Sequence, residues 1–162
     1  MSVDAQITPI TEADLHDLTA AMTRAFDDDA RTYLGLDRGG PEGYDNGDFF
    51  RKWLFSSDEC EGYKIVVDGT TVGGILVWLA EDGNNTWGNV FIDPDWQNRG
   101  ICTEAWRNVE AMYPDTRSWT LETPGYSTKN HRVYEKLGFV KIGEEDAPDH
   151  PGTSFIFRKM MK

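Results

Sequence analysis

A short turn between a predicted strand and a predicted helix has the residue types of an anion site. It consists of Gln97-Asn98-Arg99-Gly100-Ile101-Cys102-Thr103. The first turn of a helix has backbone N–H groups without intrahelical partners and the positive end of the helix dipole. Gly100 lets phosphate oxygens approach the backbone, Cys102 is small, and the Thr103 hydroxyl adds a donor. The segment therefore predicts a diphosphate cradle. A glycine-containing helix start without a ligand is the alternative.

Two other phosphate-binding motifs are missing from the chain. The P-loop pattern G-x-x-x-x-G-K-[ST] does not occur, and neither does the Rossmann pattern G-x-G-x-x-G. The sequence therefore argues against a P-loop nucleotide site and against a Rossmann dinucleotide site.

The composition is that of a folded acidic protein. The length of 162 residues favours a single domain over 1–162, and 6 Trp, 8 Phe and 6 Tyr supply large apolar side chains for a core. The net charge of -12 argues against nucleic acid as a partner, because like charges repel. An acidic surface attracts cations such as amines, or it serves only solubility.

The cysteines and histidines do not form a recognisable metal or disulfide pattern. Cys60 and Cys102 lack paired spacing, so we expect a reducing, cytoplasmic location. We expect His16, His131 and His150 at the surface or at helix ends, with no metal site. The start of the sequence lacks the features of a secretory signal, and no apolar run is long enough to cross a membrane, so no membrane partner is expected.

Hydrophobic periodicity predicts a mixed α/β sheet with helices on its faces. A helix capped by Thr11 should end before or at Asp27–Asp29, and Ile101, Ala105, Val109 and Met112 should share one helical face. The other predicted helices are an apolar one over 49–54 and one capped by Ser127 that ends at Gly138. The predicted strands are 5–10, 63–67, 73–80, 87–93, 118–123, 139–143 and 153–157.

The order of these elements predicts the connections. The strands at 63–67, 73–80 and 87–93 should form an antiparallel meander, with turns at Asp68-Gly69 and at 81–86. The strand–helix–strand unit around residues 88–122 should be a right-handed parallel crossover.

Two segments resemble one known family. Strand-D-P-x-x-Q-x-x-G-x-[small] resembles the acetyl-CoA loop of the GNAT superfamily of N-acetyltransferases, usually written Q/R-x-x-G-x-G/A. Cys102 stands where that family has Gly or Ala. Residues 127–139, S-T-K-N-H-R-V-Y-E-K-L-G-F, resemble the family segment N-x-x-A-x-x-L-Y-E-K-L-G-F. The resemblance implies a GNAT-like fold of about seven strands and about four helices, with splayed central strands.

The resemblance also implies how acetyl-CoA binds. Its diphosphate would lie on Asn98 to Thr103, and its pantetheine arm would pair with the strand Val90-Phe91-Ile92. A backbone N–H near Phe91 or Ile92 would polarise the thioester carbonyl. The usual Asn aligns with Ser127, and Asn130 follows one helical turn later, so either residue would contact the pantetheine.

The implied reaction is direct attack of a primary amine on the thioester in a ternary complex. Tyr134 is the expected general acid for the leaving thiolate; a packed tyrosine is the alternative. Glu122, in a segment similar to the LEV of N-terminal protein acetyltransferases, is the expected base, buried and with a raised pKa. A solvent-exposed or ion-paired Glu122 is the alternative, and Asp93 is a second candidate base.

The acceptor site in such folds is walled by the first two helices and their loop. Asp27–Asp29 lie there, followed by Tyr33 and Tyr44, which suits a small cationic amine or a basic peptide end. A solvated acidic loop is the alternative. The protein would be a monomer or a homodimer.

Two other functions fit the same motifs. One is a non-catalytic acyl-CoA-binding sensor module. The other is an enzyme with a different acyl donor, because Cys102 and the large Trp87, Trp96 and Trp106 could reshape the pocket.

Overall fold

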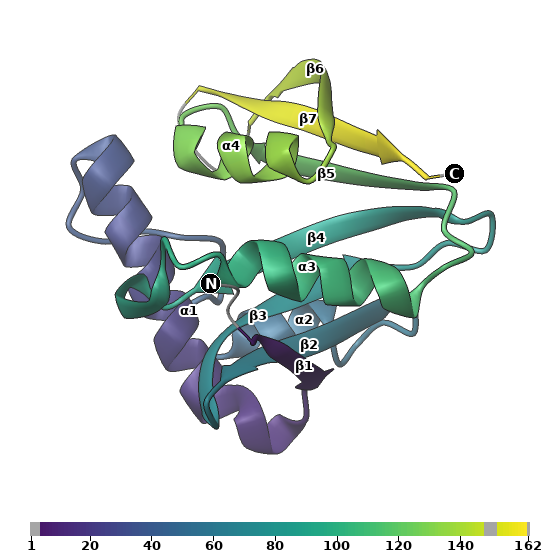
Figure 1. Cartoon of the computed structure of the whole chain (residues 1–162). Coiled ribbons are helices and arrows are strands. Elements are labelled where there is room, and N and C mark those ends of the chain that lie inside the picture. The colour runs from purple at the N-terminus through teal and green to yellow at the C-terminus, as the bar shows by residue number, and fades with distance from the viewer. Residues whose placement is uncertain (1–3, 148–151, 162) are drawn as a thin grey trace.

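A computed structural model of the protein describes residues 4–147 and 152–161. Seven strands in these residues form one sheet, in the order β1-β2-β3-β4-β5-β7-β6 (Figure 1). The strands are β1 (Gln6–Pro9), β2 (Cys60–Val67), β3 (Thr70–Trp78), β4 (Asn84–Ile92), β5 (Ser118–Pro124), β6 (Val140–Asp146) and β7 (Thr153–Met160).

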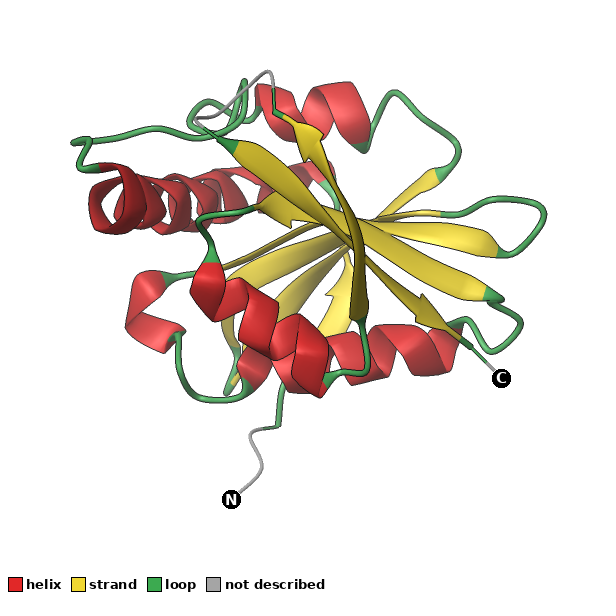
Figure 2. Cartoon of the chain, turned by 90° about the horizontal axis from the view of Figure 1, so that it is seen from above, coloured by secondary structure: helices red, strands yellow, loops and turns green. Residues whose placement is uncertain are grey.

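The helices cover both faces of this sheet. α3 and α4 lie on one face, and α1 and α2 lie on the other (Figure 2). Two apolar cores result, one beneath each pair. The helices are α1 (Leu15–Asp29), α2 (Asp48–Trp53), α3 (Ile101–Met112) and α4 (Thr128–Lys136); the short ones are η1 (Glu12–Asp14), η2 (Ala30–Leu34) and η3 (Pro94–Trp96).

The parallel crossover is present, but its two strands pair only briefly. β4 and β5 pair in parallel from Asn84–Thr86 to Ser118–Thr120 and not beyond. From there the two strands diverge, as Figure 1 shows. The predicted mixed α/β fold with splayed central strands is therefore confirmed.

Aromatic packing links the two halves of the splayed sheet. Trp87 on β4 stacks on Trp106 of α3, with ring centroids 3.8 Å apart and planes 5° apart. Tyr134 on α4 meets Trp87 edge-on at 5.1 Å, and Phe139 lies 5.8 Å from the same ring. One aromatic cluster therefore spans the divergence, which stabilises the sheet where its backbone pairing stops.

Several predicted boundaries move in the structure. The predicted turn at 81–86 is shorter, because Asn84–Thr86 supply the β4 residues that pair with β5. The capping box holds, since the Thr11 N–H donates to Asp14 Oδ2 at 2.8 Å. α1 ends at Asp29 as expected, but η2 continues it as a π-helical turn to Gly35, whose φ is 67°.

Two side chains depart from their predicted exposure. Met112 is 49% exposed because it is the last residue of α3, whereas Ile101, Ala105 and Val109 are buried as expected. His131 is buried, not superficial, because its ring fills the space between α4 and the sheet. Its Nε2 lies 3.0 Å from the Pro124 carbonyl oxygen. His150 lies outside the described residues.

Replacing Gly73 by Ala should disturb the pairing of β3 with β4. A Cβ at Gly73 would stand 2.1 Å from the Phe91 carbonyl oxygen, which is backbone and cannot rotate away. We expect the free energy of unfolding to fall by about 1–3 kcal/mol, measured by urea denaturation. Gly143→Ala is the control, because nothing lies within 4 Å of its Cβ position. Equal stability of the two variants would contradict this account of β3–β4 packing.

Candidate active site

A cavity of about 1130 Å³ lies where β4 and β5 separate. The predicted cofactor-binding residues other than Arg99 line it, together with the expected base Glu122, whereas Tyr134, Asp93, Asp27, Asp28, Tyr33 and Tyr44 do not. The structure therefore brings together residues that are up to 40 positions apart in the sequence. These are Val90, Phe91, Ile92, Gln97, Asn98, Gly100, Ile101, Cys102, Thr103, Glu122, Ser127 and Asn130.

The turn before α3 has the geometry of an anion cradle. Gly100 is the N-cap of α3 with a φ of 78°, and no atom lies within 4 Å of the place where its Cβ would stand. Within the described residues, the backbone N–H groups of 98–103 find no protein acceptor. These amides at a helix N-terminus fit a diphosphate, which would supply the missing acceptors.

Two side chains of the turn hold it in place. The Gln97 Nε2 donates to the Ile92 carbonyl at 2.9 Å, and its Oε1 accepts from Lys129 Nζ at 2.9 Å. Gln97 thus ties the turn to β4 and to α4. Arg99 donates to the Asp95 carbonyl at 3.0 Å and lies over the Trp96 ring. The side chains of Gln97 and Arg99 therefore both contact other parts of the protein.

Cys102 is a small, neutral residue in the cavity wall. Burial raises the pKa of its thiol to about 12, so the sulfur stays protonated at neutral pH. Of the three tryptophans that might reshape the pocket, Trp96 lines it, whereas Trp87 and Trp106 are buried in the core and stack on each other.

Tyr134 lies behind the cavity wall and is not among the described residues that line it. The residue is 6% exposed. Burial is the main reason that the pKa of its phenol is raised; Cys102 and Asp29 contribute, and a hydrogen bond with Thr123 opposes the shift. The phenol therefore keeps its proton at neutral pH and can donate a proton but not accept one.

Glu122 is not the buried acid that the sequence predicted. It is exposed on β5, between the buried Leu121 and Thr123, because side chains alternate along a strand. It still lines the cavity. Asp93 is held elsewhere: its Oδ2 accepts from Arg24 at 2.6 Å and its Oδ1 accepts from the Asp95 N–H at 3.0 Å. The hydrogen bond from the Asp95 N–H makes Asp93 the N-cap of η3.

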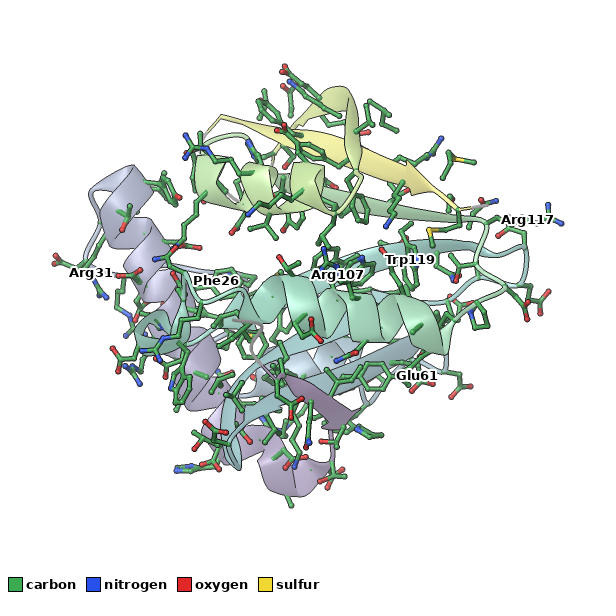
Figure 3. The ribbon with its side chains drawn as sticks, viewed as in Figure 1. Phe26, Arg31, Glu61, Arg107, Arg117 and Trp119 are labelled. Atoms are coloured by element: carbon green, nitrogen blue, oxygen red, sulfur yellow. The ribbon has the colours of Figure 1, made fainter. Side chains whose placement is uncertain are left out.

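The acidic triplet splits into three different environments. Asp27 accepts from the Tyr44 hydroxyl at 2.6 Å, so neither group is free to face a cation as predicted. Asp28 lies 4.0 Å from Arg31, which extends outward from η2, whereas Phe26 on α1 points inward (Figure 3). Asp29 lines the cavity.

The sequence analysis named Asp27–Asp29 together for the acceptor site, and of these three the structure places only Asp29 in the cavity wall. Asp29 is half-buried, and burial is the main cause that raises its pKa to about 6; Asp28 adds to the shift and Lys129 opposes it. The signal was available, because Asp29 lies four residues after Ala25 and so continues the buried stripe of α1. An acid at such a position faces the sheet.

The described residues contain neither a metal-binding cluster nor a membrane-spanning helix. In residues 4–147 and 152–161, no three His, Cys, Asp or Glu side chains gather closely enough to hold a metal ion. In the same part of the chain, no helix has the length and apolar character needed to cross a membrane.

Residues 18–139 of the chain match the Acetyltransferase (GNAT) family. The chain belongs to this family. Among curated proteins, the GNAT chain is similar to YrkN of Bacillus subtilis (strain 168), an uncharacterized protein, with 35% identity over 79 residues. That segment makes up 48% of this chain and 43% of YrkN, so the match spans less than half of the relative.

Two solved structures illustrate the shared GNAT fold. An acetyltransferase from Thermus thermophilus has a TM-score of 0.79 at 16% identity, over 99% of this chain and 100% of that one. The PaiA N-acetyltransferase from Thermoplasma acidophilum, in complex with coenzyme A, has a TM-score of 0.76 at 16% identity, over 98% of this chain and 99% of that one. At these identities the likeness shows the fold.

Gly100→Ala should weaken acetyl-CoA binding by about tenfold or more, because a methyl group would enter the cradle. The natural control is Gly69→Ala in the β2–β3 turn, where φ is 77° and the Cβ position is also open. Both variants carry the left-handed strain of roughly 1–2 kcal/mol, but Gly69 does not line the cavity. Isothermal titration calorimetry with acetyl-CoA compares them. Equal affinities for the two variants would refute the cradle.

Proposed function

We propose that this protein transfers the acetyl group of acetyl-CoA to a primary amine by direct attack in a ternary complex. The observation that supports this most is that one continuous cavity lies at the β4–β5 divergence. The unpaired amides of 98–103 and the carboxylates of Asp29 and Glu122 lie along its walls. Family membership supports the acetyl transfer, and the coenzyme A bound to the similar PaiA fold supports the donor.

In this proposal the cofactor follows the cavity wall. The diphosphate accepts hydrogen bonds from the amides between Asn98 and Thr103. The pantetheine arm runs beside Val90–Ile92, whose edge toward β5 is unpaired. Ser127 is buried at the start of α4 without a side-chain capping bond, and Asn130 is half-buried one turn later. Both line the cavity and are available to the amide groups of the arm.

The chain supplies the groups that the reaction needs. An N–H of Phe91 or Ile92 polarises the thioester carbonyl, and Tyr134 gives its proton to the sulfur as the carbon–sulfur bond breaks. Tyr134 carries that proton at neutral pH, as any phenol does, and burial raises its pKa further. The role requires the Tyr134 hydroxyl to come within hydrogen-bond reach of the sulfur between Cys102 and Thr123, both of which line the cavity. Glu122 is an exposed carboxylate on the β5 wall that can take a proton through water.

A screen for release of free coenzyme A tests this function directly. The purified protein would be incubated with acetyl-CoA and a library of primary amines, with propionyl-CoA and succinyl-CoA as competing donors. Amine-dependent release of coenzyme A together with the acetylated amine is the expected result. Tight acetyl-CoA binding without release for any amine would instead support the sensor alternative.

Tyr134→Phe should lower kcat by about 100-fold and leave the Kd for acetyl-CoA nearly unchanged, because the variant loses only the proton donor. Steady-state kinetics with the best amine and calorimetry with acetyl-CoA would separate the two effects. Tyr113→Phe is the matched control, because its hydroxyl bonds that of Tyr63 and the residue does not line the cavity. An unchanged kcat in Tyr134→Phe would remove this residue as the acid.

A further inference from the structure

The buried face of α1 ends in a carboxylate. Leu18, Met22 and Ala25 pack under the helix, and Asp29 takes the next position on the same face. There the chain widens into the π-helical turn η2, a form that is rare and frequent at functional sites. An apolar residue at position 29 would extend the core. Position 29 instead carries the acid Asp29, which lines the cavity.

Two hydrogen-bond acceptors in the cavity wall have no donor in the described part of the protein. The Asp29 carboxylate has no hydrogen bond or ion pair there, in contrast to Asp27 and Asp28. The side-chain oxygen of Asn89 on β4 is buried without a partner, and Asn89 lines the same cavity. An ammonium group has three N–H donors and no acceptor, so it suits acceptors of this kind.

Part of the wall of the same cavity is apolar. Aromatic and aliphatic side chains from η2, the following loop, α2 and β3 form it, and Trp53 packs edge-on against Trp78 at 5.9 Å. Lys52 and Glu42, which also line the cavity, lie 4.0 Å apart and offset each other. The apolar side chains in this wall are Leu34, Leu36, Pro41, Phe49, Trp53 and Trp78.

We propose that Asp29, Asn89 and this apolar wall form the acceptor site, and that the acceptor is a primary amine with one positive charge on an apolar body. Asp29 binds the ammonium group and takes its proton. This inference rests on the proposed acetyl transfer and adds to it the class of acceptor and the proton acceptor.

The protons and electrons balance along this route. The ammonium gives one proton to the Asp29 carboxylate, and the freed lone pair forms the nitrogen–carbon bond at the thioester carbonyl. The carbon–sulfur bond breaks, and the sulfur takes a proton from Tyr134. The nitrogen loses its second proton, which restores the phenol. The products are the amide, coenzyme A as its thiol, and one proton that Asp29 releases to water.

The electrostatic surroundings suit this role. Asp28 on the same element, and Lys129 and Tyr134 on α4, are the charged or titratable groups that act on Asp29. With a pKa of about 6, Asp29 is ionised at neutral pH and is a stronger base than an ordinary aspartate. An alkyl amine with a pKa near ~10.4 is then bound in its abundant protonated form.

The pH dependence of kcat/KM distinguishes this route from simple capture of free amine. With Asp29 present, kcat/KM should rise through about pH 6 and level off, because both the ionised carboxylate and the ammonium are then abundant. Asp29→Asn should lose the plateau, and kcat/KM should keep rising roughly tenfold per pH unit with the fraction of free amine. At pH 7.5 we expect a loss of ~100-fold.

Three comparisons make the result specific to Asp29. Asp28→Asn is the matched control on the same helix; it should keep the plateau and move its onset to lower pH, because a repelling charge is removed. The Kd for acetyl-CoA should be unchanged in Asp29→Asn, which also shows that the variant is folded. If Glu122→Gln removes the plateau and Asp29→Asn keeps it, Glu122 is the proton acceptor and this proposal is wrong.

A pair of amines of equal length tests the acceptor class. n-Hexylamine should exceed 1,6-diaminohexane in kcat/KM by at least ~tenfold, because the second ammonium of the diamine would be desolvated against the apolar wall. A preference for the diamine would overturn the proposed class. No coenzyme A release by the unmodified protein with any amine would mean that the proposed acetyl transfer fails. An active protein with an unchanged Asp29→Asn profile would mean that only the present inference fails.

Discussion

The early separation of β4 from β5 is the constraint on which the rest of this molecule depends. A sheet normally pairs its neighbouring strands along their length, because unpaired backbone groups are costly unless water or a ligand satisfies them. Here the two strands share three residue pairs and then part. The break is tolerated because Trp87, Trp106 and Tyr134 form one packed cluster across it. Side-chain packing thus replaces backbone pairing and leaves an open strand edge at the cavity.

The loop after β4 lies at this opening and forms part of the candidate site. The side chain of Gln97 ties the loop to a carbonyl of β4 and to a lysine of α4. The turn therefore spans the two halves of the sheet, with α3 beginning at Gly100. Because the turn is held by side chains, its own amides remain unpaired in the described structure and point to an anion as their partner.

The carboxylates near the site differ in their burial and in their hydrogen-bond partners, and these differences determine which of them can act as a base. Asp27 accepts hydrogen bonds from the Tyr44 hydroxyl and the Gly39 N–H, and Asp93 pairs with Arg24. Glu122 is exposed to water. Asp29 alone among these combines partial burial, a raised pKa and a place in the cavity wall. The same functional group is therefore a structural acceptor at one position and a candidate base at another.

Local patterns in the sequence were enough to predict the seven strands, the four helices, the parallel crossover and the glycine-containing turn before α3, because periodicity, caps and glycine placement act over a few neighbouring residues. The chain order alone did not reveal that Glu122 is exposed, that His131 is buried or that Asp29 is half-buried. Burial depends on which distant elements cover a side chain: α4 and β7 enclose His131, whereas the diverging strands leave Glu122 open. The sequence likewise did not separate Asp29 from Asp27 and Asp28; of the three, Asp29 lines the cavity because it continues the buried face of α1.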